Sequence, residues 1–180
     1  MKELVPISSD TKEMGTSGLK TILLAGLCVG TLDILAALAD YYISTGKNPG
    51  VVLKFIASGV FGRKAFSGGI NMILLGLFFH FIIAFSFTVL FFWLYPKIKL
   101  LSKNRIATGI VYGIFIWLVM NLIVVPMSQT PPHSHKIEKI IKAILILIVM
   151  IGLPLSFIAH RAFARNPLNK NDTKNDNQDL

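Results

Sequence analysis

The sequence predicts an all-α integral membrane protein, a bundle of four transmembrane helices with one further interfacial or re-entrant amphipathic helix. Hydrophobic residues make up 53% of the 180 residues and charged residues only 15%. The mean hydropathy of +0.65 lies well above that of a soluble domain. Four apolar runs each reach the length of about 20 residues that a helix needs to cross a bilayer. Little of the chain remains outside them, so a large soluble domain is excluded.

The four apolar runs have boundaries that are typical of membrane spans. The first run ends near Tyr42, and the second ends at Tyr95 and the helix-stopping Pro96, as expected where aromatic side chains meet the bilayer surface. The third run ends at Pro126, and Pro154 inside the fourth run predicts a kink. The predicted spans are residues 21–43, 68–95, 106–127 and 140–163.

Residues 50–66 are apolar but too interrupted to be a fifth span. Lys54 lies near the centre of this segment, and Arg63 and Lys64 lie at its end. We expect an amphipathic helix on the membrane surface, or a re-entrant segment, because its small residues allow it to lie between helices. Residues 1–18 are expected to form a polar tail, 19–163 the transmembrane domain, and 164–180 a disordered tail.

The distribution of basic residues predicts the orientation of the chain. The amino-terminal tail, the second loop and the carboxyl-terminal tail carry eleven of the eighteen Lys and Arg. Cytoplasmic segments are enriched in these residues, so both termini are expected in the cytoplasm, with the protein in a bacterial inner membrane. The net charge of +9 then reflects contact with anionic headgroups of the lipid bilayer, and no nucleic-acid partner is expected.

Ionisable and amide side chains within the spans are the candidate site. Asp33 and His80 each lie twelve residues into their spans, so both fall near the middle of the bilayer and are able to meet. Asp40, Asn71 and Asn121 all fall in the outer half, where they are expected to form a polar pocket. Such residues cost energy in a membrane and often mark proton, ion or solute sites. The alternative is an interhelical hydrogen bond that only holds the bundle together.

Glycines at helical spacing indicate close helix packing. Gly26 and Gly30 form a Gly-xxx-Gly pair in the first span, Gly109 and Gly113 form another in the third, and Gly76 lies one turn before His80. These faces predict either packing within the fold or association with another copy or a membrane partner. The second possibility supports the alternative function, an accessory or scaffold protein.

No catalytic motif is present, so the chain is not expected to be an enzyme, and no cofactor is expected. His133 and His135 lack obvious third and fourth ligands, so no metal site is expected either. The single cysteine, Cys28, excludes an internal disulfide and is expected to be a small core residue.

Several short stretches resemble a group of small uncharacterised bacterial inner-membrane proteins. They are TLDILAA (31–37), IASGVFGRKAFSGG (56–69), HFIIA (80–84) and VMN (119–121). PKIKL (96–100) and PMSQTPP (126–132) are similar to stretches of YagU-like proteins of unknown function. The resemblance implies a polytopic bacterial membrane protein and brings no catalytic residue with it.

Overall fold

The computed structural model describes residues 10–98, 104–131 and 137–164, and within these ranges every regular element is helical. It confirms the predicted all-α fold with four long apolar helices and a shorter one. The stretches long and apolar enough to cross a membrane are Gly18–Thr45, Ile70–Leu94, Arg105–Met127 and Ile137–Phe163. The chain is therefore a membrane protein with four predicted spans. The elements are α1 (Asp10–Thr45), α2 (Gly50–Phe61), α3 (Lys64–Ser67), α4 (Ile70–Leu94), α6 (Arg105–Val119), η1 (Met120–Val124), α7 (Val125–Met127), α8 (Ile137–Leu147), η2 (Ile148–Gly152) and α9 (Leu153–Ala164).

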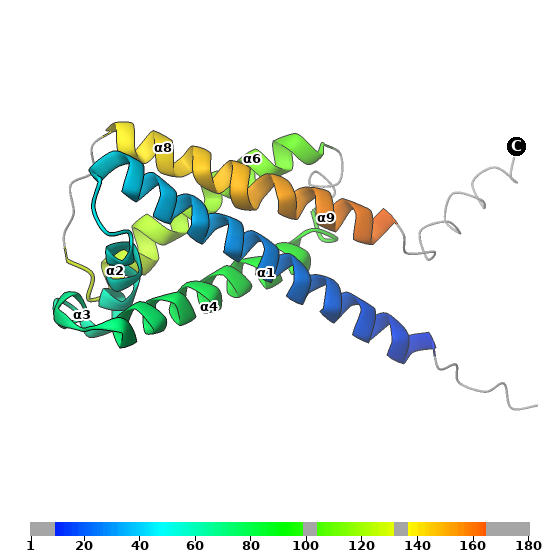
Figure 1. Ribbon diagram of the computed structural model, residues 1–180. Helices are drawn as coiled ribbons and strands as arrows, with labels where there is room; N and C mark the ends of the chain where they lie inside the picture. The colour runs from blue at the N-terminus through cyan, green and yellow to red at the C-terminus, as the bar shows by residue number, and fades with distance from the viewer. Residues whose placement is uncertain (1–9, 99–103, 132–136, 165–180) are drawn as a thin grey trace, which may run out of the picture.

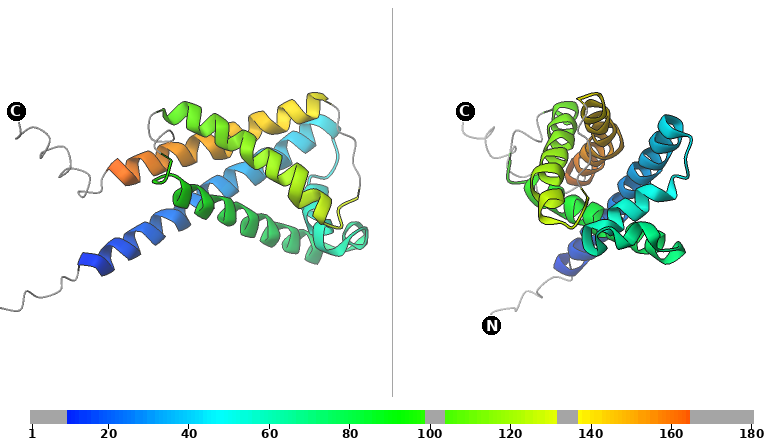
Figure 2. Two further views of the ribbon diagram at one scale, coloured as in Figure 1. Left: turned by 180° about the vertical axis from the view of Figure 1, so that it is seen from behind. Right: turned by 90° about the vertical axis from the view of Figure 1, so that its left-hand side faces the viewer.

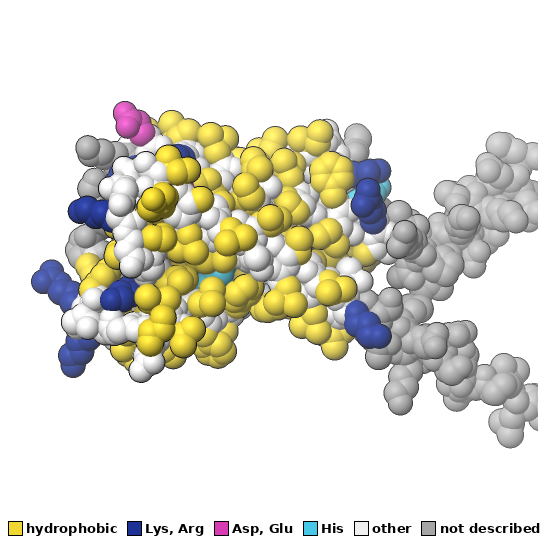
Figure 3. Space-filling view, viewed as in Figure 1, with side chains coloured by type: hydrophobic (Ala, Val, Ile, Leu, Met, Phe, Trp, Pro, Cys, Tyr) yellow, Lys and Arg dark blue, Asp and Glu magenta, His cyan; other side chains and the backbone are white. Residues whose placement is uncertain are grey.

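Successive long helices run in opposite directions along the bundle, which therefore has two distinct ends (Figures 1 and 2). The α2 end contains α2, α3, the start of α4, the end of α7 and the start of α8. The termini end contains the end of α4, the start of α6 and the end of α9. Hydrophobic side chains cover the middle of the molecule, and Lys and Arg gather at both ends (Figure 3). This distribution is that of a helical bundle in a bilayer.

The start of the first helix differs from the sequence expectation, whereas the end of the last helix agrees with it within one residue. Helix α1 begins at Asp10, so residues 10–17, assigned above to a polar tail, extend the first helix. At the other end α9 closes at Ala164, and residues 165–180 of the expected disordered tail lie outside the described part of the chain, as do residues 1–9. Helix α6 begins where the side chain of Asn104 accepts hydrogen bonds from the backbone N–H groups of Ile106 and Ala107.

The segment expected as one amphipathic helix forms two helices, α2 and α3. Gly62 separates them with a φ of +58°, a backbone conformation that glycine adopts without the steric cost of a Cβ. Leu53, Ala57 and Ser58 of α2 are buried, and α2 packs mainly against α4. The segment therefore covers one side of the bundle at the α2 end.

Each of the two long helices that contain a proline widens into a π-helical turn just before it. Segment η1 ends two residues before Pro126, and η2 ends two residues before Pro154. Proline has no N–H to donate, and its ring clashes with the carbonyl four residues earlier. The wider turn shifts the hydrogen bonds, and the N–H of Leu153 instead reaches the carbonyl of Ile148. The helix around Pro154 thus contains a π-helical turn, a feature at which helices commonly bend, and the kink itself stays a prediction.

The hydrophobic core fills the half of the bundle nearer the termini end. Its aromatic centre includes Phe91 and Tyr112, whose ring centroids lie 4.6 Å apart, and the Tyr112 hydroxyl donates to the carbonyl of Phe87. Small residues of α1 and α9 complete it: Ala25, Val29 and Ala159 are buried. This dense half joins α1, α4, α6 and α9.

Glycines lie at the crossings where the helices come closest. A Cβ on Gly76 would lie 1.9 Å from the carbonyl oxygen of Leu53, so only glycine permits α2 to approach α4 this closely. On Gly109 a Cβ would meet the backbone of Gly152 at 3.0 Å, and on Gly113 the backbone of Ile148 at 2.7 Å. These contacts bring α6 against η2 at backbone distance.

We predict that Gly76→Ala destabilises the protein, because the added methyl group would meet backbone that cannot rotate away. The expected loss is about 1–3 kcal/mol, as for an overpacked core. The measurement is reversible chemical unfolding of the purified protein in detergent. Gly18→Ala is the matched control, since a Cβ there meets nothing within 4 Å. Equal stability of the two variants would contradict the proposed crossing.

Candidate functional site

A cavity of about 430 Å³ lies in the half of the bundle nearer the α2 end. Residues of α1, α2, α4, α6, η1, α7, α8 and η2 line it, together with Ser128 and Thr130. Phe87, Ile116 and Ile151 belong both to its wall and to the hydrophobic core, so the cavity begins where the core ends. Its volume is that of a small-molecule binding site.

Asp33 and His80 lie on the wall of this cavity, on two different helices. Asp33 comes from α1 and is partly buried, whereas His80 comes from α4 and is only 8% exposed. The structure thus brings together the two residues that the sequence places near the middle of the membrane.

A hydrogen bond between α1 and α4 fixes the orientation of His80. Its Nε2 lies 2.8 Å from the carbonyl oxygen of Gly30, one helical turn before Asp33. A carbonyl only accepts, so Nε2 carries the proton. In the neutral imidazole Nδ1 is then the acceptor nitrogen, and it is the atom through which His80 is able to take up a second proton.

The cavity has a polar rim at the α2 end that the sequence analysis did not identify. The hydroxyls of Ser128 and Thr130 lie 2.6 Å apart, and the backbone N–H of Gln129 donates to the carbonyl of Gly59 in α2. This contact joins the segment after α7 to α2. The only signals in the sequence were the prolines around residues 126–132 and the small residues of α2, and neither indicates that these two segments meet.

Asp40 lies outside the cavity and forms an ion pair with Lys142 of α8. Lys142 also donates to the hydroxyl of Ser44, at 3.1 Å. Both charged side chains are partly exposed at the α2 end, where an ion pair contributes little stability. Asp40 therefore joins α1 to α8 and does not form a polar pocket with the two asparagines.

The two asparagines of the expected pocket are also placed elsewhere. The side-chain amide of Asn121 donates to the carbonyl of Trp117, one turn earlier in its own helix. Asn71 is exposed near the start of α4. Neither lines the cavity, so its polar residues among the described part of the chain are Asp33, His80, Ser128 and Thr130.

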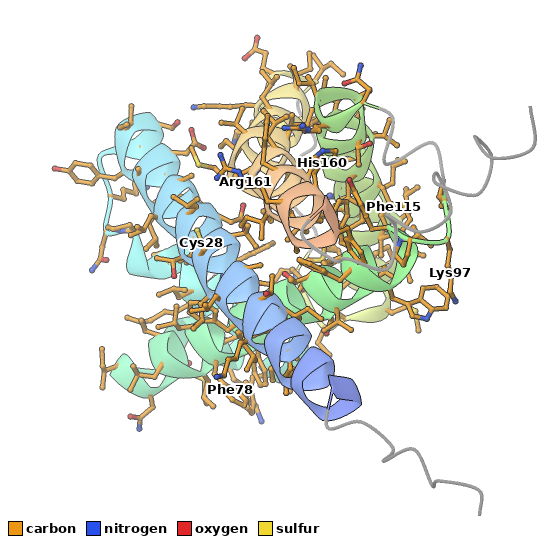
Figure 4. The ribbon with its side chains drawn as sticks, turned by 90° about the vertical axis from the view of Figure 1, so that its right-hand side faces the viewer. Cys28, Phe78, Lys97, Phe115, His160 and Arg161 are labelled. Carbon is orange, nitrogen blue, oxygen red and sulfur yellow. The ribbon has the colours of Figure 1, made fainter. Side chains whose placement is uncertain are left out.

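The remaining candidate residues lie away from the cavity. A Cβ on Gly26 would lie 2.5 Å from the ring of Phe85, and one on Gly30 would lie 3.0 Å from the ring of Phe81. Both glycines therefore pack α1 against α4. His160 lies at the termini end beside Arg161, 3.2 Å from the hydroxyl of Tyr95 (Figure 4). His133 and His135 fall outside the described residues.

The expectation for Cys28 is wrong. Its side chain is exposed on α1 and is not part of the core (Figure 4). Ala25 and Val29 are the buried hydrophobic residues on either side of it.

The wall of the cavity is mostly apolar and carries one acidic and one basic side chain. In the wall formed by the described residues, Asp33 is the sole carboxylate and His80 the sole imidazole, and neither Lys nor Arg contributes. No group of three or more His, Cys, Asp or Glu able to hold a metal occurs within the same ranges. The site is therefore suited to proton transfer and to binding a small molecule rather than a metal ion.

Comparisons with protein-family models, with curated proteins and with solved structures find no match for this chain. We therefore infer a function from the site itself.

We predict that the His80 hydrogen bond stabilises the crossing of α1 and α4. His80→Leu removes the donor and should lower the free energy of unfolding by roughly 0.6–1.7 kcal/mol, the range for interhelical hydrogen bonds in membranes. His80→Gln keeps an N–H donor and should recover part of that loss. Chemical unfolding in lipid–detergent micelles measures both variants. A Leu variant as stable as the wild type would show that the hydrogen bond does not hold these helices.

Proposed function

We propose that this protein takes up and releases protons at Asp33 and His80 in connection with a small solute that binds in the cavity. The proposal rests on one observation. A cavity of about 430 Å³, walled by helices of the membrane-spanning bundle, has a carboxylate and an imidazole on its otherwise apolar wall. A membrane protein that neither exchanges protons nor binds a solute would fill this space with apolar side chains, because cavities and buried charges both cost stability.

The two groups are suited to proton exchange by their positions. His80 is held by Gly30 through Nε2, so a proton gained at Nδ1 makes it a cation beside Asp33. A proton on either group changes the affinity of the other for protons, since the two charges interact across apolar surroundings. This coupling is what a carrier requires to load a proton on one side and release it on the other.

The alternative function, an accessory protein that binds a partner through glycine-rich faces, has less support. Gly26 and Gly30 pack against α4, Gly109 and Gly113 pack against η2, and Gly76 packs against α2. These faces are already used within one chain. A partner would therefore have to bind elsewhere on the surface.

The proposed location is a bacterial inner membrane with both termini in the cytoplasm. Helix α1 begins and α9 ends at the same end of the bundle (Figure 2), which suits termini on one side of the membrane. The excess of Lys and Arg in the tails and the second loop supports the cytoplasmic side for that end.

We predict that Asp33→Asn abolishes proton flux through the purified protein in liposomes that contain a pH-sensitive dye. Under an imposed proton gradient the wild type should dissipate the gradient faster than empty liposomes, because Asp33 and His80 relay the proton. Asparagine has nearly the same shape as aspartate but does not ionise.

Asp40→Asn is the matched control for this experiment. It makes the same chemical change on the same helix but outside the cavity, so its flux should equal that of the wild type. Equal incorporation and a folded state are checked by size-exclusion chromatography before reconstitution. Identical rates for the wild type and Asp33→Asn would contradict proton flux through Asp33 in the absence of a solute.

A further inference from the structure

We propose that the solute is a small hydrophobic organic cation, which binds with its positive charge at Asp33 and displaces a proton from that side chain. This inference rests on the proposed function and adds the chemical class of the substrate. Three properties of the cavity support it: the sign of its charge, the aromatic rings on its wall, and its size.

The charge of the wall favours a cation. Asp33 is the sole acidic residue among the described residues that line the cavity, and Lys and Arg are absent from that set. An anion would therefore meet no fixed positive charge on this part of the wall, and its own charge would stay unpaired in an apolar space. A cation of the right size instead forms the ion pair that a carboxylate in the membrane lacks.

The aromatic rings favour an organic cation over a metal ion. Phe55 of α2 and Phe79 and Phe87 of α4 all line the cavity. Phenyl faces attract ammonium groups, and aromatic walls are the usual way in which proteins bind quaternary ammonium ligands. A metal ion is usually held by several charged or imidazole ligands, and the described residues contain no group of three or more His, Cys, Asp or Glu that could hold one.

The size of the cavity favours a molecule with an apolar body. A volume of about 430 Å³ is much larger than a single ion or water, and it falls within the range for small organic ligands. Ile34, Ile56 and Met120 contribute aliphatic surface around the rings. An apolar body bound there gains the hydrophobic contribution of about 25 cal/mol for each Å² that it removes from water.

Proton displacement follows from keeping the site neutral. The proposed empty site is neutral, with a proton on the Asp33 carboxyl group. When the cation enters, the O–H bond of that carboxyl group breaks, its electron pair stays on the oxygen, and the proton leaves to the aqueous phase. The carboxylate then balances the charge of the cation.

Among the described residues that line the cavity, His80 is the one titratable group besides Asp33. The described residues that α2, α6, η1, α8 and η2 contribute to the wall are all apolar or glycine. Asp40, two turns further along α1, is paired with Lys142 outside the cavity. The released proton is therefore expected to come from Asp33, and the effect of pH on binding to depend on Asp33 and His80 together.

The test is isothermal titration calorimetry of the purified full-length protein in detergent with benzyltrimethylammonium. This probe has an aromatic ring and a permanent positive charge, and it carries no ionisable proton. Any proton released in a weakly buffered sample therefore comes from the protein. Toluenesulfonate, an aromatic anion of similar size, is the matched probe of opposite charge.

We expect benzyltrimethylammonium to bind the wild type with proton release, and toluenesulfonate to bind much more weakly. Asp33→Asn should weaken cation binding at least about tenfold, a loss of about 1.4 kcal/mol, and should abolish proton release. Asp40→Asn should bind as the wild type does. A second variant, Ala37→Leu, fills the cavity one turn from Asp33 without altering the carboxylate, and it should also lose binding.

Two results would overturn the proposal: equal affinity for the cation and the anion, or unchanged cation binding in folded Asp33→Asn. The flux experiment, which contains no organic cation, separates this failure from failure of the proposed function. Proton flux that depends on Asp33, without binding of benzyltrimethylammonium, would reject the cation and retain the proton site. Absence of both would reject both proposals.

Discussion

The close contact of α1 with α4 at Gly30 is the constraint on which the candidate site depends. Because Gly30 has no Cβ, the ring of Phe81 and the methyl group of Ala84 lie against the backbone of α1. The same residue offers its carbonyl to Nε2 of His80. Asp33 follows one turn later on the same face, so one glycine brings a carboxylate and an imidazole to one cavity.

The bundle is dense in one half and hollow in the other. Near the termini end, Phe91, Tyr112 and their neighbours fill the interior with aromatic rings. The π-helical turns η1 and η2 precede Pro126 and Pro154, and both contribute residues to the cavity wall. Helix α2 and the segment with Ser128 and Thr130 line the same cavity.

The polar groups of the bundle fall into two sets with different roles. At the α2 end, Asp40 and Lys142 are partly exposed and pair with each other, which joins α1 to α8. Deeper in the bundle, Asp33 and His80 face an apolar space. The two sets differ in their contact with water, and the free energy of a charge depends strongly on that contact. The first pair joins two helices, whereas the second pair carries the proton and solute site that we propose.

The sequence by itself determined the fold class and the four apolar spans, and it predicted a similar depth for Asp33 and His80. Hydropathy and helical rise are local properties, so they can be read without knowing which helices touch. The tertiary structure decided which polar residues meet. The predicted depths of Asp40, Asn71 and Asn121 are similar, which suggested one polar pocket. The rotation of each helix about its axis instead directs Asn121 to its own backbone and Asp40 to Lys142. The rim formed by Ser128, Thr130 and α2 likewise depends on contacts between segments that are distant in the sequence. Such contacts depend on how the helices pack, which includes the close crossings at glycines and the π-helical turns that precede the prolines.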